Sequence, residues 1–288
     1  MIELFNTVFT RPFAWVLLQI YNLTGSYGVS LIIFTLIARL IMLPFQMKSK
    51  KSMMGMQRIQ PKLKELEKKY KNDKERYALE VQKLYKDENV SMMGGCLPML
   101  ITIPIMFGLY AVLRQPLTFM FGLSEDVIAR IAETVGITLG GNVTSSAVEI
   151  QIAAEMGKYV SQIHQIVPNL QIIDFNFLGI NMAEIPSFQT FNVLWIIPIL
   201  SGVTSYVYSW IARRYQPAQN EQAGAMNRVT MIMMPLMSVW IAFIVPTGLG
   251  FYWIINNLLM IIQEPALQWY YTKFKPKHDA KKAGGVVK

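Results

Sequence analysis

The chain has 288 residues, of which 53% are hydrophobic and only 16% are charged, and its formal net charge is +9. The charged residues occur in blocks with long apolar stretches between them, which excludes an ordinary soluble protein and indicates a membrane protein. The one cysteine, Cys96, excludes an intramolecular disulfide, and the two histidines form no Cys/His cluster of the kind that binds metals.

Residues 1–25 contain an apolar run that begins after Arg11 and Pro12 and is too short to cross a bilayer. We therefore expect an interfacial helix on the outer face. Five later segments are long enough to span, because about 20 apolar residues cross the hydrocarbon. The predicted spans are residues 26–46, 93–114, 191–212, 229–246 and 248–271. The sequence thus predicts an all-α membrane protein with five transmembrane helices.

The segment between the first two spans, residues 47–92, carries two apolar seams at helical spacing. The first comprises Met56, Ile59, Leu63, Leu66 and Tyr70, and the second comprises Tyr77, Val81 and Leu84. Residues 71–73 interrupt the pattern, and Asn72 followed by Glu75 is typical of a helix start. The segment is therefore expected to form a helical hairpin, most of whose charged residues are solvated.

The segment between the second and third spans, residues 115–190, is acidic and less regular. Helical periodicity over 127–139 and 147–167, separated by Gly140, Gly141 and Asn142, predicts amphipathic helices on the outer surface. The remaining parts are a loop at 213–228 and a basic tail at 272–288.

The distribution of Lys and Arg predicts the orientation. There are 13 basic residues from Lys48 to Lys86, three from Arg213 to Arg228 and six from Lys273 to Lys288. With five spans these regions share one side, which the positive-inside rule makes the cytoplasm. The N-terminus and residues 115–190 then face outward, and the C-terminus is cytoplasmic.

Arg39 lies inside the first predicted span, where a charged side chain costs roughly 2.5–3.5 kcal/mol on insertion scales. One explanation is that its long side chain reaches the polar end at Gln46 and Lys48, about 10 Å away along a helix. Otherwise an ionisable residue at this depth indicates a functional site.

Polar side chains recur at helical spacing on several predicted spans. They are Thr35, Arg39 and Gln46 in the first, Thr102 in the second, Ser201 and Ser205 in the third, and Tyr252, Trp253, Asn256, Asn257 and Gln263 in the fifth. Hydrogen bonding between helices is one explanation, at about 0.6 kcal/mol each. The three carboxamides of the fifth span exceed what packing needs and, with an arginine, favour the wall of a hydrated cavity.

Methionines flank the predicted hairpin. Met53, Met54 and Met56 lie at its start, and Met92 and Met93 lie at its end. Flexible thioethers suit a surface that accepts many apolar partners, so these residues predict a substrate entrance. Ordinary core filling is the alternative.

Several stretches together resemble the YidC-type membrane protein insertase family. Thr35 to Pro44 is similar to the family's first core span with its arginine, Gln60 to Lys86 to its cytoplasmic hairpin, and Gly94 to Pro98 with Pro104 to Tyr110 to the opening of its second span. Phe177 to Ala183 and Phe251 to Asn257 extend the likeness, which covers residues 20–271 apart from much of the outer loop.

The sequence departs from the family pattern in two places. Ser91, Met92 and Met93 stand where the family usually has Asn-Pro, and Thr102 stands where it usually has Gln. The large folded outer domain of Gram-negative members is absent, which indicates the Gram-positive type.

The resemblance implies insertion and folding of nascent membrane proteins in the bacterial cell membrane, with or without the Sec translocon. A hydrophilic groove, open to cytoplasm and lipid, would take polar parts of the client, and Arg39 would attract its acidic residues. The implied partners are nascent membrane proteins, membrane lipids, the ribosome through the hairpin and basic tail, the Sec translocon and the signal recognition particle pathway. No cofactor, metal or catalytic residue is implied.

Other functions make different demands on the sequence. A small transporter or channel, the main alternative, should show paired ionisable residues or an internal repeat. A membrane enzyme needs a nucleophile with its base, or metal ligands, and neither histidine lies in a predicted span. A ribosome anchor would need only the hairpin and tail.

Overall fold

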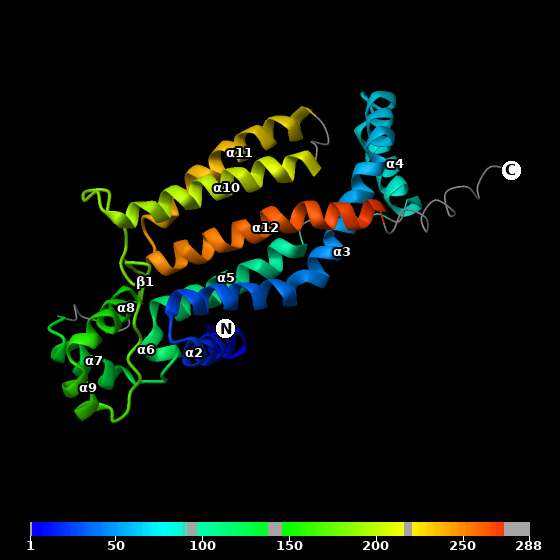
Figure 1. The fold of residues 1–288 in the computed structure, drawn as a ribbon. Coiled ribbons are helices and arrows are strands. Elements are labelled where there is room, and N and C mark those ends of the chain that lie inside the picture. The colour runs from blue at the N-terminus through cyan, green and yellow to red at the C-terminus, as the bar shows by residue number, and fades with distance from the viewer. Residues whose placement is uncertain (1, 89, 91–96, 138–145, 216–220, 274–288) are drawn as a thin grey trace. The chain divides into compact units, whose positions relative to one another are not determined.

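The computed structural model describes residues 2–88, 90, 97–137, 146–215 and 221–273 (Figure 1). These ranges are mostly helical. The elements are α1 (Ile2–Phe5), η1 (Asn6–Thr10), α2 (Arg11–Thr24), α3 (Tyr27–Lys69), α4 (Lys74–Asp87), α5 (Leu97–Arg114), α6 (Pro116–Phe119), α7 (Glu125–Thr134), α8 (Ser146–Glu155), η2 (Met156–Lys158), α9 (Val160–Ile166), β1 (Asn176–Phe177), β2 (Ile180–Asn181), η3 (Val193–Trp195), α10 (Ile196–Tyr215), α11 (Glu221–Ala242) and α12 (Thr247–Lys273).

The chain forms two compact units, and the long helices contribute residues to both. The first unit comprises Met1–Arg39, Ile101–Val203 and Leu236–Asn256, and the second comprises Leu40–Leu100, Thr204–Pro235 and Asn257–Lys288. Helix α3 continues through Pro44 and Pro61, although each proline removes one backbone hydrogen bond. The first predicted span and the first half of the predicted hairpin are therefore one helix.

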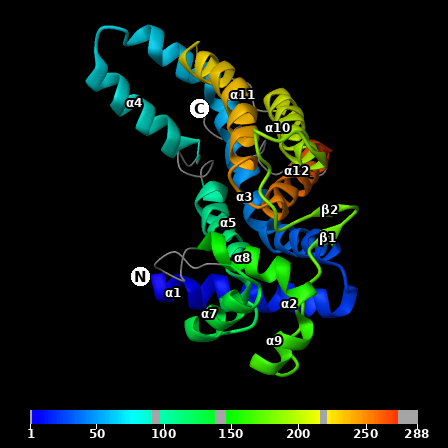
Figure 2. The ribbon, with the colours of Figure 1, turned by 90° about the vertical axis from the view of Figure 1, so that its left-hand side faces the viewer.

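The core of the first unit joins α2, α5 and the start of α3 to the helices of residues 115–190. Phe13 of α2 packs against Phe34 of α3 with ring centroids 5.6 Å apart. A Cβ at Gly108 of α5 would come within 3.1 Å of the Phe13 ring, so glycine permits this close packing. The views in Figures 1 and 2 show α2 crossing beside this part of α3.

The helices α7, α8 and α9 lie in the region for which amphipathic helices were expected. Their apolar residues Ile128, Ile131, Ile150 and Ile163 are buried in the same core as Leu17 of α2. These helices thus bury their apolar faces against protein. The expected separator, residues 140–142, lies outside the described ranges.

A short hairpin and the segment after it hold the start of α12. Strands β1 and β2 pair antiparallel, and the turn residues Leu178 and Gly179 have φ values of 53° and 78°, which is typical of a type I′ turn. The backbone N–H groups of Thr247 and Gly248 then donate to the carbonyls of Glu184 and Met182, at 2.8 and 2.7 Å. These carbonyls satisfy first-turn donors of α12 that would otherwise lack partners.

The second unit contains the hairpin formed by the end of α3 and α4, together with parts of α10, α11 and α12. Figure 2 shows α4 returning from the turn after α3, and α10 running beside α11. The cap of α4 is Asp73, whose Oδ1 accepts from the Arg76 N–H at 3.0 Å. The sequence prediction of Asn72 at this position was wrong by one residue.

Two helices in the described ranges are long and apolar enough to cross a membrane. They are Tyr27–Lys69 and the helical stretch Val193–Tyr215, and the shorter apolar helices are Ile103–Arg114 and Met231–Ala242. Helix α12 has 27 residues but belongs to neither group. The count of five spans stays a prediction.

Candidate functional site

The guanidinium of Arg39 is held by a carboxamide from α12. Its Nε donates to Oδ1 of Asn256 at 2.8 Å, and its Nη2 donates to the same oxygen. The two residues are 217 positions apart in sequence, and both side chains are half-buried. Hydrogen bonds to a charged group contribute about 1.5–3 kcal/mol, so Asn256 orients the charge of Arg39.

The other predicted site residues of the first unit have different environments. Thr35 is buried, and its hydroxyl donates to the carbonyl of Leu31 at 2.6 Å, within its own helix. Tyr252 is buried one turn before Asn256, and Trp253 is half-buried. Arg39 and Asn256 are thus two predicted residues of this unit that a hydrogen bond joins directly.

Ser201 belongs to a contact between helices that the sequence prediction missed in part. Its hydroxyl lies 2.7 Å from that of Ser238 on α11, and both side chains are buried. This geometry fits the explanation that hydroxyls join membrane helices. The feature of the sequence that could have indicated Ser238 is its hydroxyl group inside the predicted apolar span 229–246.

The predicted polar residues of the second unit also form pairs. Nε2 of Gln263 on α12 donates to Oε1 of Gln46 on α3. Nδ2 of Asn257 donates to Oγ1 of Thr204 on α10 at 3.3 Å, and both side chains are buried. Ser205, the residue that follows Thr204, is also buried. Amides from α12 thus contact both α3 and α10 in this unit.

The same unit contains a buried ion pair that the sequence prediction did not single out. Nζ of Lys50 on α3 lies 2.5 Å from Oε1 of Glu264 on α12, and the two side chains are 3% and 13% exposed. Lys50 was counted within a basic block whose charges were expected to be solvated. The feature of the sequence that could have indicated this ion pair is Glu264, an acidic residue inside a predicted span.

The described part of the methionine cluster lies on α3. Met53, Met54 and Met56 are half-buried there. Met92 and Met93 lie outside the described ranges, and Thr102 lies in α5 at a position whose side chain is not described.

Ion pairs within the hairpin involve Glu88, the C-cap residue of α4. Its carboxylate lies 2.5 Å from Nζ of Lys62 and 3.3 Å from Nη2 of Arg58, both on α3. The hydrogen bond from Lys62, with the charges of Lys62 and Arg58, lowers the pKa of Glu88. These contacts join the two helices of the hairpin.

Glu149 on α8 is a buried carboxylate in the region expected to face outward. It accepts from the backbone N–H and the hydroxyl of Thr118, at 3.0 and 2.8 Å. Burial raises the pKa of Glu149, and the Thr118 hydrogen bonds oppose that shift. Because Thr118 lies in α6, the contact joins α6 to α8.

Within the ranges that the structure describes, no group of three or more His, Cys, Asp or Glu side chains could hold a metal ion. The long apolar helices instead carry hydrogen-bonded polar side chains, which is the pattern of an α-helical membrane protein with a polar interior.

Comparison with known proteins identifies the family. The model of the 60Kd inner membrane protein family matches residues 19–277. The chain belongs to this family.

Relatives in several bacteria carry the name membrane protein insertase YidC. The one from Clostridium perfringens is 32% identical over 265 residues, which cover 91% of this chain and 87% of that protein. The one from Caldanaerobacter subterraneus subsp. tengcongensis is 29% identical, over 85% of this chain and 86% of that protein. With the relative from Geobacter sp., at 30% identity, the match covers 88% of this chain but 35% of that longer protein.

A solved structure supports the fold. The crystal structure of an active YidC insertase with its first transmembrane domain resolved matches with a TM-score of 0.52 and 20% sequence identity. The match covers 90% of this chain and 46% of that chain, and at this identity it establishes the fold alone.

Proposed function

We propose that this chain is a membrane protein insertase that inserts nascent membrane proteins and helps them fold. The observation that carries the proposal is the hydrogen bond from Arg39 on α3 to Asn256 on α12, which orients a cation between two apolar helices. Membership of the family, and near full-length relatives named as insertases, support the same function. The expected class is therefore a chaperone of the membrane, without an enzymatic reaction.

The proposed mechanism uses a hydrophilic groove open to the cytoplasm and to lipid. A polar segment entering such a groove crosses less hydrocarbon, which reduces the cost of its unsatisfied backbone groups and charges. Arg39 would attract an acidic residue of the client, since opposite charges 4 Å apart attract by about 4 kcal/mol at an effective dielectric constant of 20. The apolar part of the client would move into the lipid.

We assign to the groove the residues that the sequence predicted for it. Among them are Arg39, Tyr252, Asn256, Gln46 and Gln263. Thr35, Thr102, Ser201, Ser205, Trp253 and Asn257 complete the assignment. Hydrogen bonds of the Asn256 and Gln263 amides to side chains of α3 support it, since these groups lie on apolar helices.

We further propose five spans, an outward N-terminus and a cytoplasmic C-terminus in a bacterial cell membrane. The asymmetric distribution of Lys and Arg supports this orientation. The basic hairpin and tail suit contact with a ribosome, and Met53, Met54, Met56, Met92 and Met93 suit a substrate entrance. The Sec translocon, the signal recognition particle pathway and membrane lipids are the other proposed partners.

Site-specific cross-linking tests the proposed function. A photo-cross-linking residue replaces Arg39, Gln46 or Asn256 in turn, and each variant meets a ribosome-stalled single-span client in native membranes. We expect adducts at these positions and none at Leu23 of α2, an exposed control position. If the three positions give no more adduct than Leu23, the groove assignment is wrong.

A further inference from the structure

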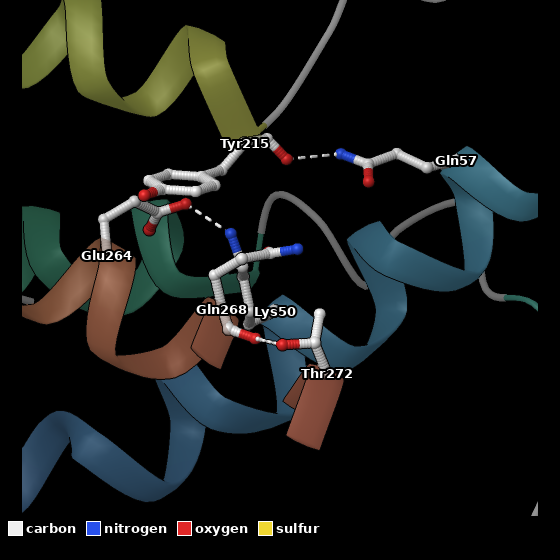
Figure 3. Close-up of polar contacts among 6 residues, drawn as sticks. All are labelled: Lys50, Gln57, Tyr215, Glu264, Gln268 and Thr272. Atoms are coloured by element: carbon white, nitrogen blue, oxygen red, sulfur yellow. Dashed lines mark hydrogen bonds and ion pairs between the residues drawn. The ribbon is translucent and has the colours of Figure 1, made fainter. Parts of the chain in front are cut away.

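The buried ion pair of the second unit lies where three helices meet. Figure 3 shows Lys50 of α3 directed at Glu264 of α12, with the ring of Tyr215 from α10 beside them. Nζ of Lys50 lies 5.6 Å from the centroid of that ring. The contact of a cation with both a carboxylate and an aromatic face places one charged residue at the junction of α3, α10 and α12.

Further polar contacts join the same helices. Gln57 lies two turns after Lys50 on α3, and its Nε2 donates to the carbonyl of Tyr215 at 2.7 Å, as Figure 3 shows. That carbonyl belongs to the last residue of α10, where the helix leaves acceptors without partners of its own. Between α12 and α3, the hydroxyl of Tyr271 donates to the carbonyl of Met47 at 2.8 Å.

The ion pair is adjacent in sequence to a pair assigned to the proposed groove. Gln46 precedes Lys50 by one helical turn, and Gln263 directly precedes Glu264. Because a buried charge needs its partner, the ion pair tolerates little sliding or rotation of α12 against α3. A shift large enough to break it would also separate Gln46 from Gln263.

We propose that Lys50 and Glu264 are positioning residues for insertion, which hold α3 and α12 in the register that keeps Gln46 against Gln263. This inference rests on the proposed insertase function. In this role the ammonium group of Lys50 interacts with Glu264 and the Tyr215 ring, and the client does not bind it. Loss of the pair therefore affects clients regardless of their charge.

Charge reversal tests the role of the pair. The variants are Lys50→Glu, Glu264→Lys and the double exchange, and the control is Arg130→Glu at an exposed position of α7. Each full-length protein is reconstituted into liposomes and supplied with two clients, one with an acidic and one with a neutral exported end. We expect each single variant to lose at least about tenfold in the insertion rate of both clients, because it leaves a buried charge without its partner. The double exchange should return both rates to within about threefold of wild type, and Arg130→Glu should change neither.

Two further measurements test the inference even if the single variants do not fold. The double variant Lys50→Met with Glu264→Leu replaces both charges with apolar side chains, and we expect it to insert both clients. Cysteines introduced by Met47→Cys and Tyr271→Cys, in a Cys96→Ser background, report the register through a short bifunctional maleimide. Cross-linking should fall in each single charge variant and return in the double exchange.

Three outcomes would overturn the inference. The first is that the single variants insert both clients and cross-link as the wild type does. The second is a double exchange that regains neither. The third is a double exchange that inserts the neutral client but fails with the acidic one, which would make Lys50 a direct client contact. Because cross-linking does not require insertion, a wild-type protein that cross-links but inserts no client would contradict the proposed function separately.

Discussion

At the scale of single residues, the central feature is the contact between Arg39 and Asn256. The guanidinium donates twice to one amide oxygen, so its position is set by a partner on another helix. A neutral partner orients the cation without cancelling its charge. This is the property that attraction of an acidic client segment requires.

The variant Asn256→Asp tests whether that charge acts on clients. It places a carboxylate where Arg39 donates, so the charge of Arg39 is largely neutralised with little change in side-chain shape. We expect insertion of a client with an acidic exported end to slow by about tenfold, or about 1.4 kcal/mol in the barrier. A client with a neutral exported end should keep its rate, measured in inverted membrane vesicles.

The control is Asn22→Asp, which makes the same change of charge at an exposed position of α2. It should leave both clients unaffected. Equal slowing of both clients by Asn256→Asp would mean that Asn256 has a structural role only. Unchanged insertion of both would remove the role of the Arg39 charge.

Residue chemistry on the spans was predictable, but the pairing was not. Helical spacing alone predicts that Arg39, Asn256 and Gln263 lie on polar faces of their helices, because periodicity identifies which residues share a face. It does not identify which helix lies opposite, so the bonds Arg39–Asn256 and Gln46–Gln263 came from the fold. Lys50 was misjudged because a lysine within a basic block is usually solvated.

At the scale of elements, the buried carboxylate Glu149 joins α8 to the short helix α6. The variant Glu149→Ala leaves the backbone N–H and hydroxyl of Thr118 without this acceptor. Because a buried donor without a partner costs about 1–3 kcal/mol, amides of α6 and α8 should exchange faster with deuterium. The exposed Glu133→Ala on α7 is the control and should not change exchange. Unchanged protection in Glu149→Ala would show that the contact contributes nothing.

The hairpin ion pairs predict a pH dependence of α4. Since the pKa of Glu88 is lowered from its ordinary value of 4.5, the ion pairs stabilise the hairpin fully above that value. The stabilisation is lost as the pH falls through the lowered pKa. Lys62 and Arg58 are more than half exposed, so we expect only about 0.2–1 kcal/mol.

Hydrogen exchange of α4 amides measures this effect. Glu88→Gln should reduce protection at neutral pH and match the wild type in acid below the lowered pKa, whereas Glu67→Gln, at an exposed position on α3, should match it throughout. A difference between Glu88→Gln and wild type that persists undiminished in acid would contradict the assignment to the Glu88 carboxylate.

Element boundaries were predicted less well than the elements themselves. Both helices of the hairpin were expected, but the cap of α4 is Asp73 because its carboxylate, and not the Asn72 amide, receives the Arg76 N–H. The sequence prediction divided the span 26–46 from the hairpin 47–92, whereas α3 runs through both. Composition changes there while the backbone hydrogen bonding continues.

At the scale of the whole molecule, the helical class and the family followed from sequence and are confirmed by the comparisons. Apolar segments separated by charged blocks were enough for the class. Residues 115–190 were the hardest part to predict, because their apolar faces bury one another, and sequence periodicity alone does not distinguish that from contact with a membrane surface.

The most direct test of the insertase proposal is insertion into liposomes that contain this protein alone. A client with an acidic exported end is synthesised beside these liposomes, and protease protection of that end is measured. We predict strong protection with the wild-type protein, weak protection with Arg39→Ala, and recovery with Arg39→Lys, which restores the charge. Protection no greater than in protein-free liposomes would contradict the proposed function, and full protection with Arg39→Ala would contradict the role of Arg39.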